Sequence, residues 1–134
     1  MILGCGIDVV DVGRVDRLLR ERGERLLGRV LTERERRALG RSRRPALPLA
    51  RRIAAKEAAM KALGTGWAGG VGFRQVEALA DAEHPSRLRL ALHGRAEDLA
   101  RALGADRIHL AVGGSRERVV AIVTLETTAG ANPR

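Results

Sequence analysis

A chain of 134 residues is long enough for one domain with a modest core, and its two aromatic residues, Trp67 and Phe73, leave that core to Leu, Val, Ile and Ala. A single cysteine, Cys5, excludes an internal disulfide, suits a reducing compartment and is expected to be a small buried hydrophobe. The 25 Lys and Arg against 16 Asp and Glu give a net charge of +9, which attracts an acidic partner. No stacking platform of aromatic residues, helix-turn-helix or zinc-finger spacing points to nucleic acid as that partner.

Residues 1–10 predict a buried strand, and Asp8 is the anomaly inside it. A carboxylate in an apolar strand is costly unless it is paired, hydrogen-bonded or bound to a cation. A structural role, as a cap or in a salt bridge, and a role as a metal ligand both stay open for Asp8. The segment lacks a basic region and a cleavage site, and no apolar run is long enough to span a membrane, so a cytoplasmic protein is expected.

A first helix is expected after this strand, with Asp11 as its N-cap and Gly23 as its stop. Its outer face is basic, and such a face is most often simply solvated. Thr32 and Glu35 then form a capping-box pattern for a short helix that ends near Gly40. Residues 41–48 are polar, basic and broken twice by proline, which predicts a mobile loop.

Residues 50–66 predict the helix around which the chain is organised. At about 100° per residue, four side chains form one apolar arc: Leu49, Ile53, Met60 and Leu63. Glu57 lies at the edge of that arc, and Lys61 follows it by one turn. The pattern alone favours an ordinary surface ion pair between Glu57 and Lys61.

The second half of the chain predicts strands at residues 75–80 and 87–92, a helix at 95–103 closed by Gly104, and strands at 108–112 and 119–126. A glycine-rich loop at residues 64–72 precedes them and can approach a ligand closely. The last two strands are joined through residues 113–116. We expect a single domain of the α+β class over residues 1–126 and a flexible tail over residues 127–134.

The central helix reads RIAAKEAAMKALGTG over residues 52–66, and this wording resembles the signature of the holo-acyl-carrier-protein synthases, the short 4′-phosphopantetheinyl transferases. The opening GCGIDVVDVGRV and the Arg29-Val30-Leu31-Thr32 segment followed by Glu33 are similar to the same family. The resemblance covers nearly the whole chain. It implies an antiparallel sheet packed with a long central helix, and a homotrimer, because longer relatives resemble two copies of this unit and a single copy needs a neighbour.

By the same resemblance, the function is the transfer of 4′-phosphopantetheine from coenzyme A to a serine of an acyl carrier protein, which releases 3′,5′-ADP. Asp8 and Glu57 match the ligands of Mg²⁺, and Lys61 is expected to stabilise charge on the phosphate, which makes these three the catalytic set. Further residues are assigned to coenzyme A: Arg52, Lys56, Gly64, Thr65 and Gly66. Arg14 and Arg17 are assigned to docking of the carrier protein, whether of fatty-acid or polyketide type.

One departure is serious. Where the family typically reads S-x-S-H before its final strand, this chain reads Ala111-Val112-Gly113-Gly114, so Gly114 replaces a histidine that contributes to the coenzyme A site. We expect a slow transferase, or one in which remaining arginines such as Arg116 partly compensate, and in either case Gly114→His should raise transfer. Two alternatives stay open: a diverged member of the fold with lost or altered activity, and a basic module that binds nucleic acid or another anion.

Overall fold

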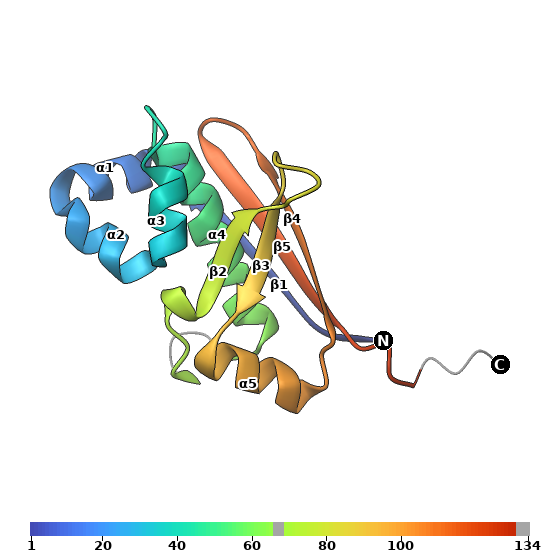
Figure 1. Cartoon of the computed structure of the whole chain (residues 1–134). Helices are drawn as coiled ribbons and strands as arrows, with labels where there is room; N and C mark the ends of the chain where they lie inside the picture. Colours follow the sequence, from blue (N-terminus) through green and yellow to red (C-terminus); the bar gives the residue numbers. More distant parts are fainter. Residues whose placement is uncertain (66–68, 131–134) are drawn as a thin grey trace.

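The structure is a computed structural model that describes residues 1–65 and 69–130. A run of helices and consecutive antiparallel strands occupy separate stretches of one chain, which confirms the α+β class (Figure 1). The elements are β1 (Ile2–Asp11), α1 (Val12–Arg22), α2 (Glu24–Val30), α3 (Glu33–Leu39), α4 (Ala46–Ala62), the short 3₁₀ helix η2 (Phe73–Gln75), β2 (Val76–Ala80), β3 (Leu88–Leu92), α5 (Gly94–Leu103), β4 (Arg107–Gly114) and β5 (Arg118–Glu126).

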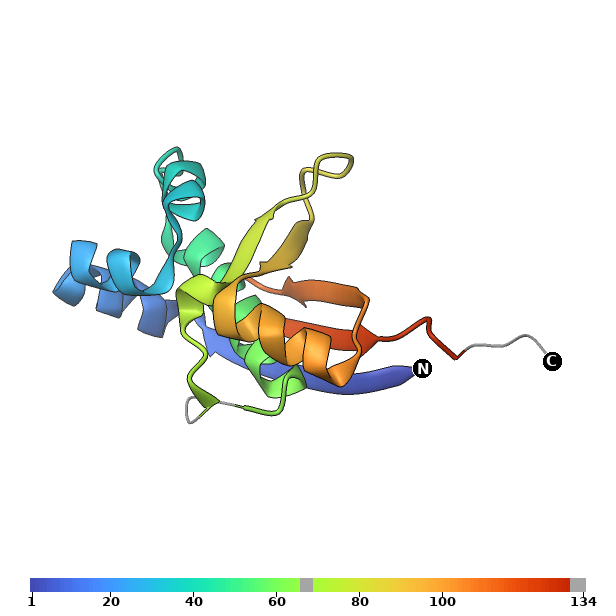
Figure 2. The same cartoon turned by 60° about the horizontal axis from the view of Figure 1, so that its bottom comes forward.

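The strands form two antiparallel sheets rather than one. A three-stranded sheet has the order β1-β5-β4, and β2 pairs with β3 in a hairpin beside it. Helix α4 packs against the three-stranded sheet, with α1, α2 and α3 grouped on its other side and α5 apart from them (Figures 1 and 2). The long central helix on an antiparallel sheet is therefore confirmed.

Two glycines of β1 let α4 approach the strand very closely. A Cβ atom on Gly4 would lie 2.2 Å from the carbonyl oxygen of Ala62, and one on Gly6 would lie 2.0 Å from that of Ala58. Only glycine avoids this overlap with the helix backbone. The close contact fixes the position of β1 along the axis of α4. It thus places Asp8, two residues after Gly6, beside the middle of the helix.

Helix α4 begins at Ala46, four residues before the predicted start, and ends at Ala62 instead of residue 66. Residues 46–48 of the predicted loop are thus helical. Pro48 is tolerated because the first turn of a helix leaves its N–H groups unpaired in any case. The predicted apolar arc is also too narrow, since Ala54, Ala55 and Ala58 are fully buried as well. A helix enclosed by a sheet and by other helices is buried on most sides.

The local signals at the element ends are confirmed. Asp11 accepts a hydrogen bond from the backbone N–H of Arg14, and Thr32 and Glu35 form the complete capping box. Gly23 and Gly104 end α1 and α5 with positive φ angles of 43° and 81°. These contacts join neighbours in sequence, which explains why the sequence alone predicts them.

The prediction that β1 is a buried strand is wrong for its outer face. Ile7, Val9 and Ile122 are exposed by 55%, 58% and 42%, and Cys5 on the same strand is exposed as well. Side chains alternate along a strand, so the residues that do not face α4 point to the other side of the sheet. No described element covers that side.

The end of the chain is tied down further than residue 126. The backbone N–H of Thr127 donates to the carbonyl of Met1 at 2.9 Å, and the hydroxyl of Thr128 donates to Asp106 at 2.6 Å. The first two residues of the predicted tail are thus fixed to the sheet edge, whereas residues 131–134 lie outside the described residues. Within the described part of the chain, no helix has the length and apolar character needed to cross a membrane.

Candidate active site

Strand β1 and helix α4 bring Asp8, Glu57 and Lys61 together. The Lys61 Nζ atom donates to Asp8 Oδ1 at 2.8 Å and to the carbonyl of Ile7 at 3.0 Å. The ion pair that the sequence predicts between Glu57 and Lys61 is therefore wrong in its partner, because β1 brings a second carboxylate to the lysine. The Asp8 side chain is 11% exposed and that of Lys61 55%, so the lysine closes the site on its solvent side.

The electrostatics of the site favour a cation. The pKa of Glu57 is raised to about 7, first by burial and then by a hydrogen bond to Asp8 and the charge of that carboxylate, while Lys61 and Arg14 act in the opposite direction. Asp8 Oδ2 is buried and has no hydrogen-bond partner among residues 1–65 and 69–130. The two carboxyl groups share the single ammonium of Lys61, so a proton on Glu57 or a bound cation is needed to balance the second carboxylate.

The donor set fits magnesium. It consists of two carboxylates, and the described residues contain no cluster of three or more His, Cys, Asp and Glu that would make a full protein cage. Mg²⁺ commonly takes one or two carboxylates and completes its octahedron with water and substrate phosphate, whereas zinc sites have three or four protein ligands that are mostly His and Cys. Asp8 and Glu57 are the residues that would hold this ion.

A hollow of about 330 Å³ opens beside Glu57. Its walls come from β1, α1, α2, α4 and η2. Three of the lining residues are charged, namely Asp11, Arg14 and Glu57. The others are apolar: Val9, Val10, Val15, Leu18, Leu26, Val30, Ile53 and Phe73. Arg14 therefore lies at the carboxylate site as well as on α1, while Arg17 is exposed on α1.

The structure does not bring Lys56 to this site. Its side chain is fully buried, and its ammonium bonds to Glu35, Val30 and Phe73 on the side of α4 that faces α2 and α3. Burial lowers its pKa, and Glu35 opposes that effect. Consecutive residues of a helix point about 100° apart, so Glu57 faces the carboxylate site while Lys56 faces the core.

The other residues assigned to coenzyme A lie at two separate places, Arg52 in the first half of α4 and Gly64 with Thr65 just beyond its C-terminal end. Arg52 is 7% exposed, donates to the carbonyl of Pro48 at 3.3 Å, and has a pKa lowered by burial. Gly64 follows the helix with a φ of +77°, and the buried Thr65 hydroxyl has no hydrogen-bond partner in the described part of the chain. Gly66 lies outside the described residues.

The glycine pair forms the end of β4 and takes part in its pairing with β5. Gly113 pairs with Val120 and Gly114 with Val119. Gly114 has a φ of +126°, and a Cβ atom there would lie 2.2 Å from the carbonyl oxygen of Arg118. Any side chain at position 114 is strained on this backbone, which counts against the expectation that Gly114→His repairs the site.

Sequence reasoning missed two features of this region. A hollow of about 370 Å³ beside the glycine pair is lined by Arg51 as well as by Arg116, whose role the sequence had suggested. The buried pair between Lys56 and Glu35 was missed too, although the capping box at Thr32 pointed to Glu35. Arg51 and Arg116, like the two members of the buried pair, are far apart in sequence, which explains why only the fold reveals them.

Comparison with known proteins decides the family. Residues 4–123 match the 4′-phosphopantetheinyl transferase superfamily. The chain belongs to this superfamily. It is 48% identical over 129 residues to the holo-[acyl-carrier-protein] synthase of Solidesulfovibrio magneticus, a match that covers 94% of this chain and 99% of that relative.

Solved structures of the superfamily share the fold. The chain is similar to the crystal structure of the holo-[acyl-carrier-protein] synthase of Neisseria meningitidis, with a TM-score of 0.85, 33% identity, and coverage of 95% of this chain and 100% of that one. It is also similar to the synthase of Bacillus anthracis in complex with CoA (3′,5′-ADP), with a TM-score of 0.76, 32% identity, and coverage of 96% and 99%. The resemblance to the short transferases is thus confirmed.

Proposed function

We propose that this transferase moves 4′-phosphopantetheine from coenzyme A to a serine of an acyl carrier protein, with 3′,5′-ADP as the second product. The observation that carries the proposal is the Asp8–Glu57 carboxylate pair with Lys61 bound to it, built by β1 and α4 in a chain of this superfamily. Relatives that match almost the whole chain are named for this reaction, and one was solved with CoA (3′,5′-ADP).

Asp8 and Glu57 would hold Mg²⁺, which supplies charge neutralisation for a pyrophosphate group when it is bound. In phosphoryl transfer the protein contributes mainly position and charge. An ammonium group has three N–H donors, and Lys61 uses two of them, on Ile7 and Asp8. The third donor of this half-exposed side chain is available to a phosphate oxygen of coenzyme A.

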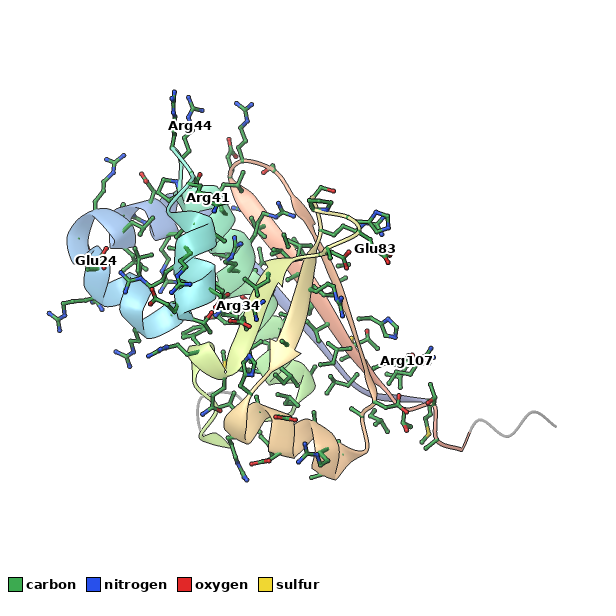
Figure 3. The ribbon with its side chains drawn as sticks, viewed as in Figure 1. Glu24, Arg34, Arg41, Arg44, Glu83 and Arg107 are labelled. Atoms are coloured by element: carbon green, nitrogen blue, oxygen red, sulfur yellow. The ribbon has the colours of Figure 1, made fainter. Side chains whose placement is uncertain are left out.

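The carrier protein is proposed to dock on α1. Arg14 and Arg17 are exposed there, and Arg14 also lines the hollow beside Glu57, so a partner on this helix lies next to the carboxylate site. Arg44, between α3 and α4, extends outward at the same end of the molecule (Figure 3), and Arg41 of the same segment is exposed as well. An acidic carrier protein is attracted by such a surface.

We also propose that the active form is a homotrimer in the cytoplasm. The exposed isoleucine and valine side chains on the outer face of β1 and β5 support an apolar contact with a second subunit. The single cysteine supports a reducing compartment.

A diverged protein without transferase activity is the second candidate, and it is less favoured. The reason to consider it was the glycine pair. Gly113 and Gly114 continue the pairing of β4 with β5, and Asp8, Glu57 and Lys61 lie together on β1 and α4. The near-complete match to transferases supports activity.

The test is mass spectrometry of apo-carrier proteins, of both fatty-acid and polyketide type, incubated with coenzyme A, Mg²⁺ and this protein. We expect the mass of at least one carrier to rise by one phosphopantetheine group, and a carrier whose acceptor serine is replaced by alanine to stay unchanged. A folded protein that modifies no carrier at any Mg²⁺ concentration would overturn the proposal.

A further inference from the structure

Lys56 has no donor left for a ligand. Its Nζ atom bonds to the carbonyl of Val30 at 2.8 Å, to Glu35 Oε1 at 2.5 Å and to the carbonyl of Phe73 at 3.1 Å. An ammonium group has three N–H donors, so all three are used. The side chain is also fully buried, so a phosphate group cannot reach it without a rearrangement of the core.

The partner of Lys56 is itself bound from several directions. Glu35 Oε1 also accepts from the backbone N–H of Thr32 at 2.9 Å, and Oε2 accepts from that of Ala78 at 3.1 Å. The Thr32 hydroxyl donates to Glu77 Oε2 at 2.6 Å. A continuous polar network therefore joins α4, α3 and β2 through the core, and Arg34 lies at its outer end between α3 and β2 (Figure 3).

The network also reaches the hollow beside Glu57. Val30 and Phe73, whose carbonyls bind the ammonium, both contribute to the walls of that hollow. Glu57, the next residue of α4, lies in the same lining. Lys56 thus binds the backbone of two segments that line the hollow, the end of α2 and the start of η2, from the core side.

We infer that Lys56 is a positioning residue for the transfer, which acts through Glu35, Val30 and Phe73 on the hollow between Glu57 and the docking helix α1 and does not touch coenzyme A. The inference rests on the proposed function for its kinetic consequence. The burial of the Lys56 ammonium in the core does not depend on that function. A charge that is paired and fully hydrogen-bonded is rigid, because each partner would be left unsatisfied by any movement.

A first experiment uses the unaltered protein, which contains two lysines, Lys56 and Lys61. An amine-acetylating reagent followed by peptide mass spectrometry reports on each of them. We expect Lys61 to react in the native protein and to be protected by 3′,5′-ADP with Mg²⁺. Lys56 should react only after denaturation. Native reaction of Lys56 at a rate similar to that of Lys61, with protection by 3′,5′-ADP, would overturn the inference.

A second experiment separates positioning from contact. The double variant Lys56→Met/Glu35→Gln removes both charges, because removal of one alone leaves a buried unpaired charge. We expect KM for the carrier protein to rise between about tenfold and a hundredfold, as for a displaced binding wall, while the affinity for 3′,5′-ADP with Mg²⁺ stays within about twofold. Lys61→Met is the contrasting variant and should lose affinity for 3′,5′-ADP.

A core variant outside the hollow controls for general destabilisation. Leu39→Ala on α3 removes a buried side chain that does not line the hollow, and it should leave KM for the carrier unchanged. An unchanged KM in the folded double variant, or a loss of affinity for 3′,5′-ADP, would overturn the inference. If the double variant does not fold, the acetylation pattern of the parent decides. A parent without transfer refutes the proposed function and leaves that pattern as the test of Lys56.

Discussion

Asp8 and Glu57 are two acids in one site, one with an unpartnered buried oxygen and the other with a pKa raised to about 7. Glu57→Gln removes charge but almost no volume, so we expect it to abolish Mg²⁺-dependent transfer and leave the fold intact. Asp8→Asn should have the same effect. The measurement is the rate of carrier modification alongside circular dichroism, and transfer at the parent rate by either variant would refute the proposed metal site.

The raised pKa of Glu57 predicts a dependence on pH with a definite sign. The folded metal-free protein holds this proton more tightly than the unfolded chain, whose carboxyl titrates near 4.5. The stabilisation from this group is complete below about pH 4.5 and is lost as pH rises through about 7. Mg²⁺ competes with the same proton, so its binding should weaken below pH 7.

Thermal unfolding and Mg²⁺ titration between pH 5.5 and pH 8.5 measure both effects. Glu57→Gln is the control, because it cannot titrate, and its metal-free stability should lack this contribution. A parent whose Mg²⁺ affinity does not change over this range would contradict the assignment of the proton to Glu57.

At the scale of elements, α1 links docking to the site. Arg14→Glu with Arg17→Glu should raise KM for the carrier protein and leave KM for coenzyme A nearly unchanged, and the carrier affinity of the parent should fall with salt. Arg14 also lowers the pKa of Glu57, so the single variant Arg17→Glu is the cleaner probe. Steady-state kinetics at pH 8.5 measure both constants, and equal losses for the two substrates would contradict the docking role.

The end of β4 makes a second prediction at this scale. Gly114→Ala should lower the free energy of unfolding by about 1–3 kcal/mol, because its Cβ atom meets the Arg118 carbonyl at a φ reserved for glycine. Gly113→Ala is the matched control, since a Cβ atom there meets nothing within 4 Å. Urea unfolding of both variants measures the difference, and equal stabilities would show that the hairpin adapts.

At the scale of the whole molecule, the exposed apolar face of the three-stranded sheet is proposed to hold the trimer together. Ile122→Glu should therefore shift the protein from trimer to monomer and reduce transfer. Leu103→Glu on α5 is a matched control, because Leu103 is 43% exposed against 42% for Ile122 and lies away from this sheet. Sedimentation velocity measures the assembly, and a parent that is a stable, active monomer would refute the trimer.

The sequence by itself determined which elements form and where those with a local cap begin or end, but not the two ends of α4. The capping box at Thr32, the N-cap at Asp11 and the glycine stops at Gly23 and Gly104 act within a few residues, so their effect is readable without a fold. The resemblance in the central helix likewise predicted the family and the pairing of Asp8 with Glu57 in one site.

Only the tertiary structure decided which face each charged side chain of α4 meets. It paired Lys61 with Asp8, placed Lys56 in the core with Glu35, and gave Gly114 a positive φ angle at which a side chain is strained. Each of these contacts joins segments far apart in sequence, or depends on a backbone angle. A helical pattern orders side chains around an axis, but the elements that pack on each side decide what those side chains bind.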